Sequence, residues 1–152
     1  MAKSKADDAS EGPTIIGWNE YVALPAWGIG RLRAKVDTGA RTASVHVENI
    51  EEVGRDRVRF DVITGPRKKP RRVRVEAPVH RRGTVRIGSG HRQARIFVCT
   101  TLRLGPHERE VEINLEDRAD MIYRMILGRS TLAGLPVLVD VNRASVLKPK
   151  TE

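Results

Sequence analysis

The chain has 152 residues, of which 39% are hydrophobic and 31% charged, and its formal net charge is +9. This length suffices for one ordinary hydrophobic core and is short for two, so we expect a single domain. No run of about 18 apolar residues occurs, and the polar segment 1–14 lacks the apolar centre of a secretory signal, so we expect a cytoplasmic protein with no membrane partner. The single Cys99 excludes an internal disulfide framework and a zinc site made of several thiolates from one chain.

The apolar pattern is that of a mainly β protein. We expect a disordered leader over residues 1–14, one folded domain over 15–148 and a tail over 149–152. Alternating apolar and polar residues predict strands near 32–36, 45–47, 58–62 and 72–76, and the glycines of segment 83–91 predict a tight hairpin. Further strands are predicted at 94–102, 110–115, 125–128 and 137–141, with a short helix over 129–135.

The positive charge is concentrated in segment 67–95, which holds eleven Lys and Arg residues and one acid, Glu76. All of the basic excess of the chain therefore lies in this segment. Such a concentration indicates a polyanionic partner, either an acidic substrate or nucleic acid. The alternative is a solvated loop kept soluble by its charge.

An Asp-Thr-Gly motif, formed by Asp37, Thr38 and Gly39, follows the alternating strand that ends near Val36. The motif alone is weak evidence, because an aspartate at the end of a strand often bonds its own backbone in a turn. A second motif lies some ninety residues downstream, where the sequence Met-Ile-Leu-Gly-Arg-Ser-Thr-Leu at 125–132 combines apolar residues, a glycine and a helix start.

These two motifs, with the Gly-rich hairpin between them, resemble the aspartic peptidases of the retropepsin family. A closer resemblance covers nearly the whole chain through the segments 17–18, 22–25, 35–42 and 123–129. It is to the bacterial retropepsin-like group that is often labelled "ATP-dependent zinc protease" and often encoded beside ATP-grasp ligases. The resemblance implies a retropepsin-like closed β-barrel with a flap hairpin and one short C-terminal helix.

The resemblance also implies the roles of individual residues. The catalytic residues would be Asp37, Thr38 and Gly39, with Thr38 bonding across a two-fold axis. The residues supporting this turn would be Ala40, Leu127, Gly128 and Arg129. A flap over residues 81–91 would contact the substrate through Arg86, Gly88, Ser89 and Gly90. Viral members usually carry an acid where this chain has Arg41, and that acid pairs with the arginine that corresponds to Arg129, so here Arg129 needs a different partner.

Peptide hydrolysis of this kind uses two nearby carboxylates that share one proton, one acting as general base and the other as general acid. One chain offers a single Asp-Thr-Gly motif, so the second Asp37 must come from another copy in a symmetric homodimer. The expectation is an aspartic endopeptidase without a cofactor. Its basic segment would attract acidic protein substrates, an idea that the neighbouring ligases support because some of them add glutamate to proteins.

Two alternatives belong to other classes. A zinc-dependent peptidase would need clustered ligands, whereas His46, His80, His91 and His107 are scattered and are interpreted as surface or turn residues. A non-catalytic RNA- or ribosome-binding module would use segment 67–95. With only two Trp, two Tyr and two Phe in the chain there is little for bases to stack on, so purely nucleic-acid-binding function is not favoured.

Overall fold

The computed structural model describes residues 12–117 and 122–147. In this part the protein is one mainly β domain with a single short α-helix. The strands are β1 (Thr14–Ile16), β2 (Asn19–Leu24), β3 (Ile29–Val36), β4 (Ala43–Val53), β5 (Arg57–Thr64), β6 (Arg71–Pro78), β7 (Arg81–Arg86), β8 (Arg92–Leu104), β9 (His107–Glu116), β10 (Met125–Leu127) and β11 (Val137–Val139). A 3₁₀ turn, η1 (Pro25–Trp27), follows β2, and the helix α2 spans Arg129–Leu132.

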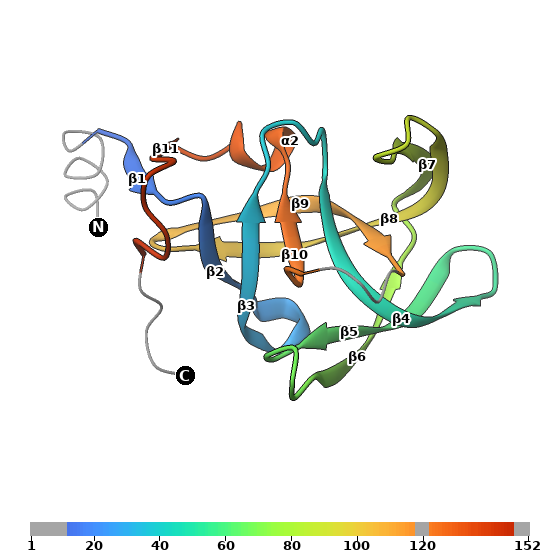
Figure 1. The fold of residues 1–152 in the computed structure, drawn as a ribbon. Coiled ribbons are helices and arrows are strands. Elements are labelled where there is room, and N and C mark those ends of the chain that lie inside the picture. Colours follow the sequence, from blue (N-terminus) through green and yellow to red (C-terminus); the bar gives the residue numbers. More distant parts are fainter. Residues whose placement is uncertain (1–11, 118–121, 148–152) are drawn as a thin grey trace.

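Strand β10 closes part of the main sheet into a ring. It pairs in parallel with β3, where Leu127 lies opposite Val36, and antiparallel with β4, where Met125 lies opposite Val45. The pairings continue from β3 through β2, β8 and β9 to β4, so they return to β10 as a ring. Strands β5 and β6 extend outward from β4, and β7 extends from β8, as Figure 1 shows.

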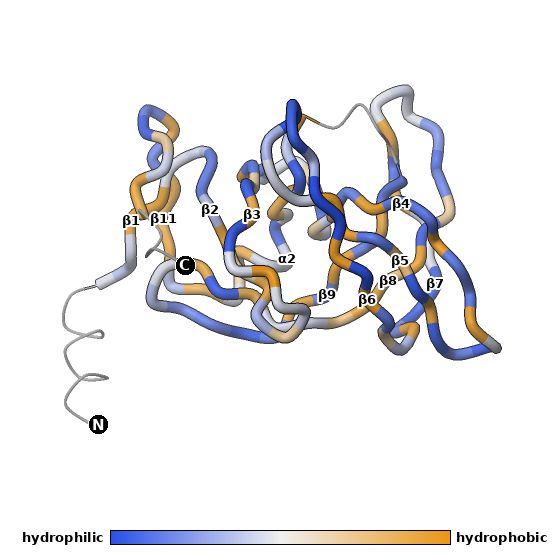
Figure 2. Tube along the Cα trace, turned by 90° about the horizontal axis from the view of Figure 1, so that it is seen from below, coloured by the Kyte–Doolittle hydropathy of each residue, from blue (hydrophilic) through white to orange (hydrophobic). Residues whose placement is uncertain are grey.

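The core is built from every second residue of these strands, because successive side chains in a strand point to opposite faces. In β5, Val58, Phe60 and Val62 are fully buried, whereas Arg57 is exposed. This alternation is visible along β4, β5 and β6 in Figure 2. Burying such side chains contributes about 1.5–3 kcal/mol each, which makes this core the main source of stability.

The predicted strands, the hairpin and the short helix are all present. The helix ends at Leu132, earlier than the predicted 135, because Gly134 and Pro136 follow it and cannot extend it well. Strands β1 and β2 had no counterpart among the predicted elements. The predicted tail and residues 1–11 of the predicted leader lie outside the described residues, and β1 begins at Thr14. No helix of the described part is long and apolar enough to cross a membrane.

A buried carboxylate ties both ends of the described chain to the ring. Glu20 in β2 has no solvent exposure, and its oxygens accept hydrogen bonds from the backbone amides of Gly17, Val146 and Leu147 at 2.7, 2.9 and 3.0 Å. Strands β1 and β11 pair in parallel beside this clamp. The segment after β11 is therefore fixed by a side chain from near the start of the fold.

Candidate active site

The Asp-Thr-Gly turn follows β3, and the β10–α2 segment holds it in place. The amide of Asp37 donates to the carbonyl oxygen of Leu127 at 3.0 Å, and the amide of Arg129 donates to the carbonyl oxygen of Ala40 at 2.9 Å. Leu127 itself is fully buried. In Figure 1 the β3–β4 connection lies beside α2 at one end of the ring. Residues that lie some ninety positions apart in the sequence thus meet at this turn.

Gly128 allows the two segments to touch backbone to backbone. A Cβ atom at this position would lie 2.4 Å from the carbonyl oxygen and 2.8 Å from the amide nitrogen of Thr42. Both distances are far below van der Waals contact, and neither Thr42 atom can rotate away. The glycine of the second sequence motif is therefore required by the close approach.

The carboxylate of Asp37 is half-buried and only partly engaged. Its Oδ1 accepts a hydrogen bond from the amide of Gly39 at 3.0 Å, and its Oδ2 has no hydrogen-bond partner among the described residues. Thr38 and Gly39 are exposed. One copy of the protein thus presents a single carboxylate with a free oxygen on an exposed turn.

Arg129 binds the turn directly. Its Nη1 donates to the carbonyl oxygen of Thr38 at 2.9 Å, which supplies the partner that the sequence left open. Arg41, the residue that replaces the usual acid, makes no side-chain hydrogen bond or ion pair within the described part of the chain. The backbone carbonyl of Thr38 is therefore the acceptor for Arg129, in place of the acidic side chain that viral members carry at the position of Arg41.

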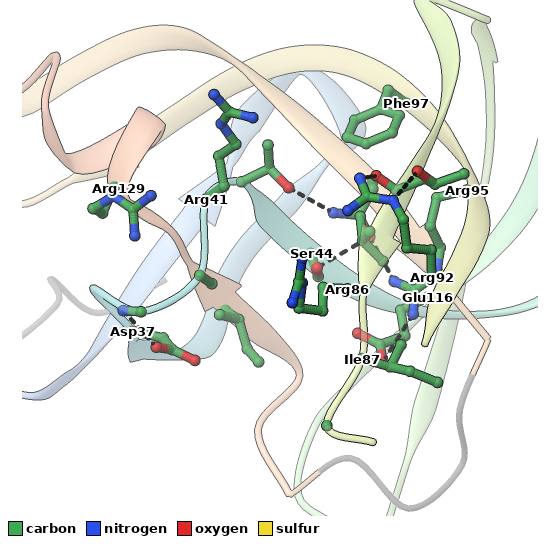
Figure 3. A pocket seen from close by; sticks show the side chains of 18 of the residues that line it. Asp37, Arg41, Ser44, Arg86, Ile87, Arg92, Arg95, Phe97, Glu116 and Arg129 are labelled. Atoms are coloured by element: carbon green, nitrogen blue, oxygen red, sulfur yellow. Dashed lines mark hydrogen bonds and ion pairs between the residues drawn. The ribbon is translucent and has the colours of Figure 1, made fainter. Parts of the chain in front are cut away.

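A cleft of about 790 Å³ separates the Asp37 turn from the β7–β8 hairpin. Figure 3 shows Asp37, Arg41 and Arg129 on one side and Arg92, Arg95 and Glu116 on the other. The charged side chains of the lining are two acids and six arginines: Asp37, Glu116, Arg41, Arg81, Arg86, Arg92, Arg95 and Arg129. With low-dielectric walls, such an excess of one sign concentrates anionic ligands.

A buried polar network joins the hairpin side of the cleft to the turn. Arg95, 8% exposed, donates from Nη1 to Oδ1 of Asn114 at 2.8 Å and forms an ion pair with Glu116 at 3.4 Å. The amide nitrogen of Asn114 donates to the Thr42 hydroxyl at 3.1 Å and to the Ala43 carbonyl at 2.8 Å. Because its polar members bond one another, the network positions the end of the turn relative to β8.

The base of the hairpin is fixed by Arg81. This guanidinium makes two hydrogen bonds to Glu112, at 2.6 and 3.0 Å, and lies 3.7 Å from the centre of the Phe97 ring. The hydrogen bond from Arg81 holds the pKa of the Glu112 carboxyl below its usual value. Both contacts restrain the hairpin where it leaves the ring.

The far part of the hairpin carries fewer contacts. The Arg86 side chain has no hydrogen-bond or ion-pair partner among the described residues, and Arg92 bonds only Thr84. Arg86 and Gly88, two of the residues expected to contact the substrate, line the cleft, and the contact itself stays a prediction. Ser89 and Gly90 belong to the hairpin turn but are not among the lining residues.

His46 differs from the sequence-based interpretation. It was predicted to be a surface or turn residue, but it is 2% exposed in β4, between two buried valines. Its Nδ1 lies 3.2 Å from Nη1 of the buried Arg124. Burial, and next the charge of Arg124, lower the pKa of His46 from 6.5. The alternation of apolar residues did not identify His46 as a core residue, because histidine is polar and yet can occupy a buried position.

In the described residues no group of three or more His, Cys, Asp or Glu side chains could hold a metal ion.

A mainly β ring with an Asp-Thr-Gly turn in front of an apolar-apolar-Gly strand defines a retropepsin-like protein. A family model described as "Retropepsin-like aspartic endopeptidase RimB" matches residues 15–150. The chain therefore belongs to the RimB-like family.

Known relatives agree with this fold. A crystal structure of a protein of unknown function from Legionella pneumophila superposes with a TM-score of 0.72 at 29% identity, covering 89% of this chain and 98% of that chain. A probable alpha-L-glutamate ligase from Shewanella halifaxensis is 34% identical over 91% of this chain and 31% of its own length. Another, from Parasynechococcus marenigrum, is 37% identical over 83% and 28%. The chain thus spans about a third of the length of these curated relatives.

Proposed function

We propose that the protein is an aspartic endopeptidase whose active site forms when two copies bring their Asp37 carboxylates together. The observation that carries the proposal is the half-engaged Asp37 carboxylate at the edge of a large cleft, on a turn held rigidly by Gly128 and Arg129. Such preorganisation favours catalysis, because the reacting groups need not be reordered during the reaction.

In this mechanism the two Asp37 carboxylates share one proton, because neighbouring like charges cannot both be ionised easily. The ionised one removes a proton from water, and the protonated one donates to the carbonyl oxygen of the peptide. The exposed position of Thr38 supports an interface between copies at this turn. The ring of strands would be the closed barrel of the fold, and the β7–β8 hairpin would be the flap that covers the substrate.

The charge of the cleft supports an acidic protein substrate. Arg41 and Arg86 line the cleft without a carboxylate partner among the described residues, so both are available to acidic side chains. Relatives about three times as long as the matched region are named probable alpha-L-glutamate ligases, and a glutamate-rich product would be a substrate of this kind. Their ligase name describes those longer proteins and is not proposed for this chain.

The test compares wild type with Asp37→Asn on a fluorogenic peptide of glutamates and on a matched peptide of glutamines. The expected result is cleavage of the glutamate peptide by wild type, weaker at high salt, and no cleavage by the variant. Asp56→Asn is the matched control. It removes an exposed carboxylate from the turn before β5 and should keep full activity. Wild-type activity of Asp37→Asn would refute the catalytic assignment. Equal cleavage of both peptides at every salt concentration would refute only the acidic specificity.

The dimer requires its own measurement. Sedimentation velocity should detect a dimer for both wild type and Asp37→Asn, since the substitution keeps the shape of the side chain. Activity per chain should fall on dilution below the dissociation constant. A protein that is monomeric at the concentrations where it cleaves peptide would contradict the shared site.

A further inference from the structure

The basic segment 67–95 is not one continuous basic surface. Five of its eleven cations form ion pairs with carboxylates from other strands, and these are Arg72, Arg74, Arg81, Arg82 and Arg95. The acids come from β4 and β9: β4 is separated from the basic strand β6 by β5, and β9 pairs with β8, the strand of Arg95. The packing of the strands thus neutralises nearly half of the positive charges that the sequence concentrates in this segment.

The six remaining cations form two separate groups. Arg86 and Arg92 line the cleft. The other four are Arg67, Lys68 and Lys69 in the β5–β6 connection and Arg71 at the start of β6; all four are exposed and have no carboxylate partner among the described residues. None of these four lines the cleft. In Figure 1 the β5–β6 connection lies at the opposite end of the molecule from the β3–β4 connection. We call residues 66–71 the basic turn.

The basic turn has a fixed backbone. A Cβ atom on Gly65 would lie 2.9 Å from the carbonyl oxygen of Lys69, and the amide of Lys69 donates to the carbonyl oxygen of Pro66 at 3.0 Å. From inside the fold, the buried Arg124 donates to the carbonyl oxygens of Gly65 and Pro66 at 3.1 and 3.3 Å. Pro70 further limits the backbone. The backbone that carries the four cations is thus held in place before any ligand arrives, which lowers the entropy cost of binding.

We propose that the basic turn binds the phosphate backbone of double-stranded RNA. The turn is narrow, because Arg71, its last residue, is the paired neighbour of Thr64, which lies just before the turn in the adjacent strand. In an A-form RNA helix the major groove is narrow, so phosphates of both strands lie close enough for one compact group of cations to reach. In B-form DNA the major groove is about 12 Å wide, and only the minor groove, about 6 Å wide, brings two rows of phosphates close together. Contact through phosphates also needs no aromatic side chains.

This binding is independent of the proposed peptidase activity. It would hold the enzyme on a ribonucleoprotein while the cleft, at the other end, acts on a protein segment. RNA binding would also give a role to the basic turn, whose cations have no carboxylate partner among the described residues and do not line the cleft.

The expected salt dependence of RNA binding follows from the release of counterions from the phosphates. Four phosphate contacts give a slope of log K against log salt of about −3.6, so affinity should fall about 150-fold between about 50 and about 200 mM KCl. The experiment measures fluorescence anisotropy of a labelled RNA duplex of about 16 base pairs, mixed with the full chain. The double variant Lys68→Gln/Lys69→Gln should halve the slope, and neutralising Arg67 and Arg71 as well should abolish binding.

Two control variants remove equal charge elsewhere. Arg57→Gln/Arg59→Gln removes two arginines that are paired with Glu76, and Arg86→Gln/Arg92→Gln removes two cations of the cleft that have no carboxylate partner among the described residues. Both should bind RNA within about twofold of wild type, and circular dichroism should show all variants folded.

Several results would overturn the proposal. They are no RNA binding by wild type at low salt, equal loss in the Arg57/Arg59 control, or loss in the cleft variant with none in the turn variant. A DNA duplex bound as tightly as RNA would refute the argument from groove width. A glutamate peptide that binds the turn when RNA does not would identify an acidic protein as the partner instead.

Discussion

Replacing Gly128 with alanine should displace the turn that carries Asp37. The added methyl group would lie 2.4 Å from the carbonyl oxygen of Thr42 and 2.6 Å from its carbonyl carbon, so the two backbones must separate by roughly 1 Å. Overpacking of this kind costs about 1–3 kcal/mol. The hydrogen bond from the Arg129 amide to Ala40 would also lengthen, at a further cost of about 1 kcal/mol. The expected loss of unfolding free energy is about 2–4 kcal/mol.

Urea unfolding, followed by tryptophan fluorescence, measures this loss, and the melting temperature should fall by about 5–15 °C. Gly88→Ala is the matched control, because a Cβ atom there meets nothing within 4 Å. It should change stability by less than about 0.5 kcal/mol. If Gly128→Ala were as stable as Gly88→Ala, the contact between this strand and the turn would not be as tight as described, and the reasoning would fail.

Three further predictions concern groups away from this contact. Glu20→Gln replaces one acceptor oxygen with an NH₂ group that faces the backbone amide of Leu147, so two donors would meet. Urea unfolding should show a loss of unfolding free energy of about 1.5–3 kcal/mol. An unchanged urea midpoint would contradict the role of Glu20 in holding the two segments. The lowered pKa of His46 means that the unfolded chain takes up a proton that the folded chain does not, so stability should fall as the pH drops below 6.5. His46→Gln should flatten that fall between about pH 7.5 and about pH 5.5, and an identical pH profile would exclude the histidine as its cause. Arg129→Lys cannot reproduce the guanidinium geometry at the turn, so peptidase kcat should fall about ten- to hundredfold with little change in KM, and a change in KM alone would contradict a positioning role.

The strands and the turn could be predicted because they depend on local pattern. Alternation identified β3, β4 and β5, and the two motifs located Asp37 and Gly128 together. The partner of Arg129 could not be predicted, since a backbone carbonyl has no signature in the sequence. The Glu20 clamp was also missed, because its acceptor role depends on amides more than a hundred residues away.

The charge pattern shows the same difference between local and long-range information. Summing charges along segment 67–95 describes a basic surface, but the acids that neutralise Arg72, Arg74 and Arg82 come from β4, some twenty to thirty residues earlier. Their pairing depends on strand register, which is fixed by the packing of the whole sheet. Only the cations beyond the reach of those acids remain available to a ligand.

The Glu20 clamp has a consequence for how the domain can be combined with others. Because Glu20 holds Gly17 on one side and Leu147 on the other, segments near the two ends of the described fold lie together, and Figure 1 shows both ends on the same side of the molecule. A polypeptide could therefore enter and leave on one side, and the domain could be inserted into or joined to a larger protein without a linker that crosses the whole fold. The longer relatives, in which the matched region makes up about a third of the chain, show that such joining occurs.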